Sequence, residues 1–252
     1  MDLQLKGSRV LVTGGTRGIG RATVEAFADE GAVVEFCARD AGEIETTEKA
    51  LAERGRATGV QLDVSDGPAL ISWVESAAER MGGLDAVVAN VSAIAVPDTE
   101  ENWYTGFETD LMHTVRLSKA ALPYLETSNN GSIVAISSVS GREADFTAGP
   151  YATMKTAIVG YISALAFQMA GRGVRANVVS PGNTYFENGF WQNAEQNMPD
   201  LFSMALGLNP TGRMGRPEEM AKAVVFLSSP VSGFTTGTNL VVDGALTRGI
   251  QL

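Results

Sequence analysis

Tyr151 and Lys155 are the pair of residues in the sequence best suited to moving protons. They are four residues apart in a segment with helical spacing of its apolar residues, so both side chains project from one face. An ammonium group held beside a phenol stabilises the phenolate, which suits the pair to general acid–base catalysis. A packed tyrosine beside a solvated lysine shows the same spacing, and the pair therefore needs support from other residues.

Ser138 is a candidate partner for this pair. It follows the apolar run Gly131–Ser137, which predicts a strand, and precedes Tyr151 by thirteen residues. Ligands bind at the carboxyl ends of parallel strands, where a serine hydroxyl can hold a substrate oxygen. The chemistry indicated by the three residues is proton transfer at a bound substrate oxygen.

A glycine-rich turn near the N-terminus indicates a second kind of site. The predicted strand Arg9–Thr13 runs into the sequence TGGTRGIG, and a helical pattern of apolar residues follows. Glycines at such a turn let a pyrophosphate approach backbone N–H groups at the positive end of the helix. A tight turn without a ligand is the simpler alternative for a lone glycine cluster. The residues expected to contact a dinucleotide here are Gly14, Thr16, Arg17, Gly18, Ile19 and Gly20.

The end of the second predicted strand, Ala32–Ala38, bears on which dinucleotide binds. Arg39 follows this run directly, and its guanidinium together with that of Arg17 can hold a 2′-phosphate in bidentate fashion. NADP(H) is therefore favoured over NAD(H). Two alternatives stay open: Arg39 is a solvated surface residue, or the strand ends earlier and Glu35 binds the ribose hydroxyls of NAD(H).

The elements that must position these residues repeat along the chain as short strands and longer helical segments. Seven apolar runs, each closed by a turn signal, predict an α/β fold: a doubly wound Rossmann domain with a seven-stranded parallel sheet and helices on both faces. The predicted strands are Arg9–Thr13, Ala32–Ala38, Thr58–Leu62, Asp85–Ala89, Gly131–Ser137, Arg175–Val179 and Asn239–Val242.

The composition shows no linker, so we expect a single domain over residues 1–252. Residues 1–130 are expected to bind the dinucleotide, and residues 131–252 to carry the catalytic group and a lid. The lid is the stretch Pro181–Arg216, interpreted as irregular and rich in aromatic residues and methionine. Its apolar side chains either cover the active site or anchor the stretch on the core.

Charge and cysteine content narrow the function classes. The sequence has 19 Lys and Arg against 29 Asp and Glu, a net charge of −10, so no nucleic-acid-binding surface is expected. The one cysteine, Cys37, forms no disulfide within the chain, which favours a reducing, cytoplasmic location. We expect no signal peptide or membrane span, because polar residues and a glycine interrupt the longest apolar stretch, Ala157–Phe167.

The glycine-rich turn, Ser138, Tyr151 and Lys155, in this order and in a chain of this length, resemble the short-chain dehydrogenase/reductase family. The resemblance runs nearly end to end and is strongest to the branch of 3-oxoacyl-carrier-protein reductase-like enzymes. It implies that Tyr151 is the general acid/base, that Lys155 binds the nicotinamide ribose and favours the phenolate, and that Ser138 positions the substrate carbonyl. Hydride transfer between the nicotinamide and the substrate carbon is the implied reaction.

The resemblance also implies contacts to the dinucleotide beyond the glycine-rich turn. They come after the third strand on the adenine side, after the fourth strand, and after the sixth strand on the nicotinamide side. In addition to Tyr151 and Lys155, the implied cofactor-binding residues are Asp63, Val64, Asn90, Pro181, Gly182 and Thr184.

Two departures from the family's pattern bear on the site. The chain has Ser92 where the backbone normally comes close to the dinucleotide. The family's active-site asparagine falls at Asp110, whose carboxylate can accept the same hydrogen bonds but adds a charge near Lys155 and Tyr151. We therefore place Asp110 in the catalytic group and expect an altered pH profile.

The only histidine, His113, lies one helical turn after Asp110. No second histidine or cysteine is near it in the sequence, so no metal site is expected. We interpret His113 as a residue of a helix surface or of a subunit interface, outside the site.

The segment Thr156–Ala170 is apolar nearly all round. A helix with this pattern is buried on both sides, here against the sheet and against a second subunit. The family resemblance implies the same helix at an interface, in a homodimer or homotetramer.

These observations predict an NADP(H)-dependent oxidoreductase that interconverts a ketone and a secondary alcohol of hydrophobic or amphipathic character. Its partner is that small molecule, with no nucleic acid and no membrane. One alternative is an NAD(H)-dependent dehydrogenase of an alcohol, sterol or polyol, which Glu35 would favour. The other is a catalytically weak dinucleotide-binding regulator, which Asp110 and Ser92 keep open.

Overall fold

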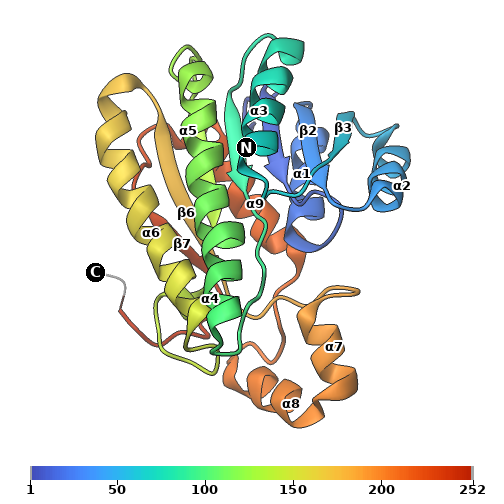
Figure 1. The fold of residues 1–252 in the computed structure, drawn as a ribbon, viewed down its shortest axis with the longest axis vertical. Helices are drawn as coiled ribbons and strands as arrows, with labels where there is room; N and C mark the ends of the chain where they lie inside the picture. The colour runs from blue at the N-terminus through green and yellow to red at the C-terminus, as the bar shows by residue number, and fades with distance from the viewer. Residues whose placement is uncertain (1, 251–252) are drawn as a thin grey trace.

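The computed structural model describes residues 2–250, and its strands form one seven-stranded sheet. Neighbouring strands pair in parallel in the order β3-β2-β1-β4-β5-β6-β7 (Figure 1). The strands are β1 Arg9–Thr13, β2 Val33–Ala38, β3 Arg56–Gln61, β4 Ala86–Ala89, β5 Ser132–Ile136, β6 Arg175–Pro181 and β7 Asn239–Val242. The predicted doubly wound sheet is confirmed, with only small differences at the strand ends.

Nine named α-helices lie within residues 2–250, and most of them follow a strand. A π-helical segment, Phe107–Met112, joins two of them without a break. The helices are α1 Gly18–Asp29, α2 Ala41–Leu51, α3 Gly67–Met81, α4 Glu100–Gly106, α5 His113–Leu125, α6 Pro150–Met169, α7 Phe190–Asn197, α8 Pro199–Leu208 and α9 Pro217–Ser228.

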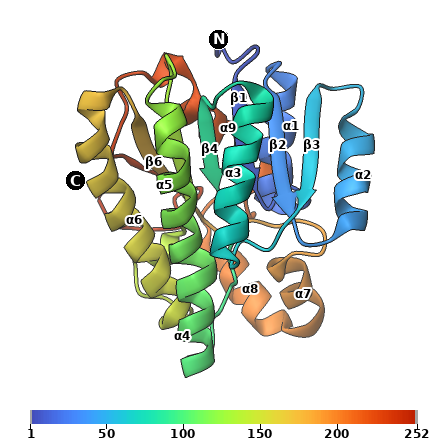
Figure 2. The same ribbon diagram turned by 45° about the horizontal axis from the view of Figure 1, so that its top comes forward.

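The helices cover both faces of the sheet, with α3, α5 and α6 on one side and α1 and α9 on the other (Figure 2). Central strands such as β1 and β4 are buried on both faces because their apolar residues are nearly continuous. Along β1, Leu11 belongs to the core cluster under α3, α5 and α6, whereas Val10 and Val12 belong to the cluster under α1, α2 and α9. This alternation follows from the two-residue period of a strand.

The strand order reverses between β1 and β4, which places a crevice at their carboxyl ends. The chain builds β2 and β3 outward from one side of β1, and then crosses to add β4 and the later strands on the other side. Ligands of open parallel sheets bind outside such a switch point. The glycine-rich turn after β1 therefore lies at the edge where a ligand is expected.

Residues 181–216, called the lid segment from here on, are not irregular as predicted. They contain α7 and α8, which project from the carboxyl edge of the sheet (Figure 1). Trp191 and Ala194 of α7 pack with Ala205 of α8 and with Met214 in a small core of their own. The prediction was wrong because two short helices, separated by Met198 alone, give too few periodic repeats to be distinguished from a loop.

Helix α6 is buried on one face only within this chain. Ile158 and Ile162 are buried against the sheet side, whereas Gly160 and Ala164 are exposed and Phe167 is 89% exposed. The predicted burial on both sides is therefore not present within a single chain, and a second subunit against the outer face stays a prediction.

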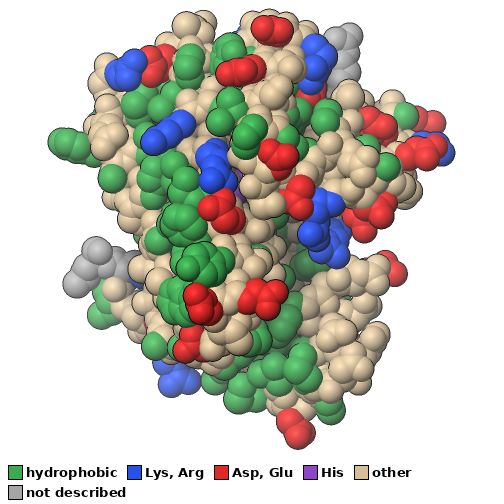
Figure 3. Space-filling model, viewed as in Figure 1, with side chains coloured by type: hydrophobic (Ala, Val, Ile, Leu, Met, Phe, Trp, Pro, Cys, Tyr) green, Lys and Arg blue, Asp and Glu red, His purple; other side chains and the backbone are tan. Residues whose placement is uncertain are grey.

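Exposed apolar side chains also gather around α4 and over α8 (Figure 3). Those around α4 include Trp103, Tyr104 and Phe107, and those at α8 include Met204 and Leu208. None of the helices within residues 2–250 is both long and apolar enough to span a bilayer.

Candidate active site

Ser138, Tyr151, Lys155 and Asp110 come from neighbouring segments of the fold. Ser138 lies just beyond β5 and begins a short 3₁₀ turn, in which its Oγ accepts a hydrogen bond from the Ser140 N–H at 3.1 Å. Tyr151 and Lys155 lie in the first turns of α6, which begins with Pro150 at a favourable helix start. The Nζ of Lys155 is 5.7 Å from the centroid of the Tyr151 ring.

Lys155 is a buried cation with a buried acidic partner. Its Nζ lies 3.1 Å from Oδ1 of Asp110, and both side chains are 2% exposed. The same ammonium donates to the backbone carbonyl of Ile136 at 3.2 Å. A buried ammonium needs such partners, because removing an ion from water costs several kcal/mol, on the order of 5, unless charge and hydrogen bonds compensate.

Asp110 reaches Lys155 from the π-helical segment between α4 and α5. The carboxylate Oδ2 accepts the backbone N–H of Ala93 at 2.9 Å, which links the π-helical segment to the stretch that follows β4. A π-helical turn inserts an extra residue into a helix and is often found at functional sites. Here it positions the acid that faces Lys155, and the carboxylate accepts a hydrogen bond from the Ala93 N–H.

His113 is not on a surface, and the prediction that placed it there was wrong. It is fully buried, and its Nε2 lies 3.0 Å from Oγ1 of Thr13 at the end of β1. Burial, with the Lys155 charge as a smaller contribution, lowers the pKa of His113 to about 4, despite the opposing effect of Asp110. The imidazole is therefore neutral at neutral pH and belongs to the packing between β1 and α5.

The glycine-rich turn has a backbone that only glycine adopts readily at its key positions. Gly14 has φ +70° and Gly18 has φ +53°. A Cβ on Gly20 would lie 2.0 Å from the Gly14 carbonyl oxygen, so this glycine allows α1 to start against the turn. Asn90 holds the turn in place by donating its side-chain amide to the Thr13 carbonyl at 2.9 Å.

The start of α1 is suited to an anion. Arg17 is the N-cap residue but makes no side-chain capping bond, and the first turn, which contains Ile19, carries no acidic residue. The N–H groups of a helix start without such caps are available to a phosphate, and the helix dipole favours negative charge there. The residues at this turn therefore fit a pyrophosphate.

The side of the crevice predicted to hold the adenine carries exposed charges. Arg17 and Arg39 are both exposed, and neither forms an ion pair within 4 Å with an acid in the described part of the chain. Asp63 is exposed next to buried Val64, and hydrogen bonds from Ser65, with the charge of Arg39 nearby, lower the pKa of Asp63.

Glu35 is buried within the sheet and is not available to a ribose, so the alternative in which it binds the ribose hydroxyls of NAD(H) is wrong. It is in the middle of β2, 5% exposed, where its carboxylate accepts from the Trp73 indole N–H at 2.7 Å. It also forms an ion pair with Arg80 at 2.7 Å. These partners from α3 keep Glu35 inside the sheet face, and β2 continues to Ala38 as first predicted.

The segment after β6 is the one that the sequence predicts to contact the nicotinamide. Pro181 ends that strand, and a Cβ on Gly182 would lie 2.8 Å from the Cα of Asp243, so the two segments pass closely there. Thr184 is buried, and its Oγ1 donates to the Gly182 carbonyl at 3.0 Å. Its segment pairs with Gly215 through an isolated bridge, which ties the two ends of the lid segment together.

Phe186 is a contact that the sequence reasoning missed. Its ring lies between two glycines: a Cβ on Gly18 would be 2.7 Å from the ring, and a Cβ on Gly189 would be 2.8 Å from it. Phe186 therefore packs the lid segment against the glycine-rich turn. Gly189, just before α7, is the feature of the sequence that could have indicated an aromatic ring packed closely against the backbone.

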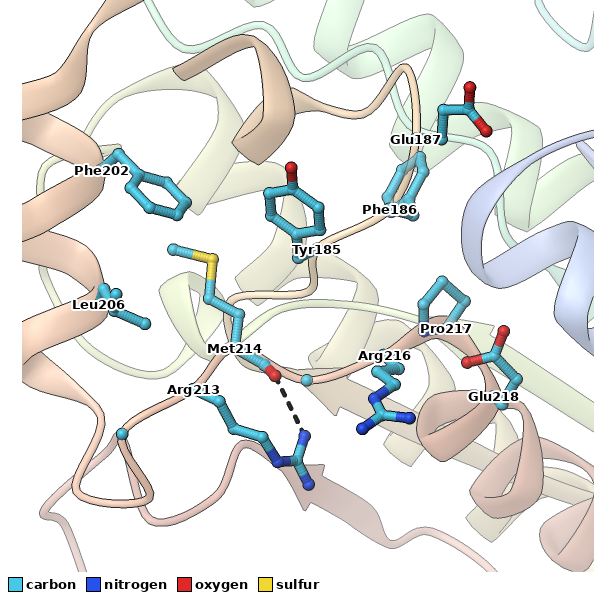
Figure 4. Close-up of a pocket in the computed structure, with 12 residues that line it drawn as sticks. Tyr185, Phe186, Glu187, Phe202, Leu206, Arg213, Met214, Arg216, Pro217 and Glu218 are labelled. Carbon is cyan, nitrogen blue, oxygen red and sulfur yellow. Dashed lines mark hydrogen bonds between the residues drawn. The ribbon is translucent and has the colours of Figure 1, made fainter. Parts of the chain in front are cut away.

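A cavity of about 600 Å³ lies on the other side of Phe186, between the lid segment and the start of α9 (Figure 4). Its walls include the Tyr185 and Phe202 rings, which meet edge to face at 6.2 Å. Ser138, Tyr151 and Lys155 do not line this cavity. It is separate from these three residues, and Tyr185, Phe190, Trp191 and Phe202 pack in the small core of the lid segment.

Comparisons with known proteins agree with this geometry. A family model described as enoyl-(acyl carrier protein) reductase matches residues 14–247. Isoepoxydon dehydrogenase of Aspergillus clavatus is 39% identical, over 98% of this chain and 97% of that protein. The 3-oxoacyl-[acyl-carrier-protein] reductase of Vibrio cholerae is 32% identical, over 97% of this chain and 99% of that protein.

Solved structures show the same fold. A short-chain oxidoreductase from Pseudomonas aeruginosa, described as NADPH-bound and as containing an atypical catalytic centre, has a TM-score of 0.88 and 30% identity, covering 96% of this chain and 98% of that one. A short-chain dehydrogenase/reductase from Burkholderia xenovorans has a TM-score of 0.89 at 30% identity, covering 96% and 97%. The chain therefore belongs to the short-chain dehydrogenase/reductase family of nicotinamide-dependent oxidoreductases, and it is similar to that family's 3-oxoacyl-acyl-carrier-protein reductases.

Proposed function

We propose that the protein is an NADP(H)-dependent oxidoreductase that interconverts a ketone and a secondary alcohol, with Tyr151 as the general acid/base. The observation that carries the proposal is the buried ammonium of Lys155, held between Asp110 and the Ile136 carbonyl, 5.7 Å from the centroid of the Tyr151 ring. A buried charge at the carboxyl edge of a parallel sheet is costly, and it is characteristic of a functional site.

Each residue of the catalytic group has a distinct role in this proposal. Ser138 donates its hydroxyl hydrogen to the substrate oxygen, since its Oγ already accepts from Ser140. Tyr151 gives a proton to that oxygen during reduction and takes it back during oxidation. Lys155 stabilises the phenolate by its charge. Asp110 compensates the Lys155 charge and fixes its direction.

The dinucleotide would be held by the glycine-rich turn, by Asn90 behind it, and by the turn after β6. Lys155 would also contact the nicotinamide ribose. When bound, NADP(H) supplies or accepts the hydride. The cofactor-binding residues in this proposal are Gly14, Thr16, Arg17, Gly18, Ile19, Gly20, Arg39, Asp63, Val64, Asn90, Tyr151, Lys155, Pro181, Gly182 and Thr184.

The preference for NADP(H) rests on Arg17 and Arg39. Both guanidiniums are exposed and without an ion-pair partner in the described residues, so they are available to a 2′-phosphate. Glu35, the residue that would have favoured NAD(H), is engaged with Trp73 and Arg80 instead. The similar Pseudomonas aeruginosa structure is described as NADPH-bound, in line with this proposal.

We propose a hydrophobic or amphipathic substrate. Phe146, in the loop between Ser138 and Tyr151, is 44% exposed and meets Trp191 of the lid segment with ring centroids 6.0 Å apart. An exposed ring beside the catalytic loop offers apolar contact to a substrate. The relatives are named for isoepoxydon and for 3-oxoacyl groups on acyl carrier protein, and both names denote carbonyl or alcohol chemistry.

The first test is titration of the purified protein with NADPH and NADH by fluorescence, followed by a panel of alkyl, aryl and sugar ketones with the tighter-binding dinucleotide. Turnover of apolar ketones with NADPH supports the proposal, and turnover of sugars alone overturns the substrate class. Tyr151→Phe should bind NADPH and lose at least about 10²-fold in kcat. Unchanged kcat in this variant would show that the phenol is not the acid.

A further inference from the structure

Glu43, on α2, places a carboxylate beside the glycine-rich turn. The hydroxyl of Thr16 donates to Oε2 of Glu43 at 2.7 Å, although the two residues are 27 positions apart in the sequence. Thr16 is adjacent to Arg17, one of the two arginines of the proposed 2′-phosphate site. A negative charge from a neighbouring helix is therefore held at the turn.

The position of Glu43 is fixed by the start of α2. Asp40 is the N-cap residue of this helix, and its side chain accepts the Glu43 N–H at 2.9 Å. Since Arg39 precedes Asp40 directly, the first turn of α2 begins next to the end of β2. Glu43 makes no ion pair with a lysine or arginine of the described residues, so its charge is not neutralised locally.

We infer that Glu43 is a selectivity residue that limits the preference for NADP(H) over NAD(H). This inference rests on the proposed function, because it assumes that the adenine ribose lies at this corner. A carboxylate repels a 2′-phosphate. It also accepts the hydrogen bond of the Thr16 hydroxyl, which could otherwise donate to the phosphate. By contrast, a ribose hydroxyl can donate to a carboxylate, as acids near this edge of a Rossmann sheet do.

The opposing charges together set the affinity for a 2′-phosphate. Arg17 and Arg39 attract the 2′-phosphate, and Glu43 reduces that attraction. The chain should therefore bind NADPH more tightly than NADH by a smaller factor than two free arginines would give. Removing the Glu43 charge should increase the discrimination without touching the catalytic group.

The test measures binding of two cofactor fragments by isothermal titration calorimetry: adenosine 2′,5′-bisphosphate and adenosine 5′-monophosphate. The variants are Glu43→Gln and the control Glu45→Gln, which removes an exposed acid of the same helix that pairs with Lys49. Glu43→Gln should raise the preference for the bisphosphate about three- to tenfold at low ionic strength. The gain should shrink in 0.5 M salt, because exposed charges are screened.

A preference within twofold of wild type in Glu43→Gln overturns the inference. An equal rise in Glu45→Gln also overturns it, since net charge alone would then explain the change. Arg39→Gln in the same assay tests the proposed function separately: lost preference for the bisphosphate supports the arginine assignment, and unchanged preference overturns that assignment alone. Thermal unfolding followed by circular dichroism verifies that each variant is folded.

Discussion

At the scale of single residues, partners that are far away in the sequence decide what a side chain does. Ser138, Tyr151 and Lys155 could be singled out because their types and spacing carry information. Glu35 and His113 could not be placed, because their partners are Trp73, 38 residues away, and Thr13, 100 residues away. A sequence pattern shows which residues are neighbours along one helix or strand, and it does not show contacts between residues that are far apart in the sequence.

The buried pair of Asp110 and Lys155 gives a prediction for stability. Asp110→Ala leaves the Lys155 ammonium buried without an anionic partner and should cost about 3–5 kcal/mol of unfolding free energy. Asp110→Asn should cost less, because its amide oxygen still accepts a hydrogen bond from Lys155. Urea unfolding of both variants measures the difference, and an Ala variant as stable as wild type would contradict the pairing.

His113 gives a prediction for pH dependence. Its pKa falls from 6.5 in the unfolded chain to about 4 in the folded one. The unfolded state therefore binds the proton more readily. The contribution of neutral His113 to the free energy of unfolding is fully present above pH 6.5 and is lost as the pH falls from 6.5 through 4. The loss from this group amounts to about 3 kcal/mol. Urea unfolding at pH 7, 5.5 and 4.5 should show a smaller decrease in His113→Leu than in wild type; parallel decreases would refute the assignment.

At the scale of elements, periodicity was informative where segments were long or wholly apolar. All seven strands were predicted. Strands such as β4 and β5, which are buried on both faces, read as continuous apolar runs, whereas the edge strand β3 has the mixed sequence RATGVQ and was predicted to start two residues late. Helices α7 and α8 were not, because Gly189, Met198 and Pro199 divide a stretch of about twenty residues into pieces with two or three turns each. Their stability comes from a small core formed with Met214, which no local pattern shows.

The contact of Phe186 with Gly18 and Gly189 predicts how the lid segment responds to substitution. Phe186→Ala removes the ring that joins the lid segment to the glycine-rich turn, so α7 should open more often and be cleaved several-fold faster by chymotrypsin, which cuts after Phe190 and Trp191. Phe234→Ala, at a fully exposed ring outside the lid segment, is the matched control and should be cleaved at the wild-type rate. Equal protection of residues 187–210 in all three proteins would count against the contact.

At the scale of the whole molecule, the outer face of α6 is one of the apolar surfaces that a single chain leaves exposed. Gly160 and Ala164 allow close approach of another helix, and Phe167 offers a large apolar side chain on the same face. We expect a homodimer or homotetramer in which this face is covered. Phe167→Arg should shift the molar mass from light scattering towards the monomer at micromolar concentration, and a wild-type monomer would remove the prediction.

The buried thiol of Cys37 can be used to measure how often β2 separates from its neighbouring strands. The side chain is 0% exposed in β2, its pKa is raised to about 12 by burial, and it is the only cysteine in the sequence. A thiolate-directed reagent can therefore modify the chain only when β2 separates from its neighbours, so the labelling rate measures the free energy of that opening. Because the Cys37 carbonyl accepts the N–H groups of Gly14 and Gly15, a dinucleotide that binds the turn should slow the labelling in proportion to its affinity.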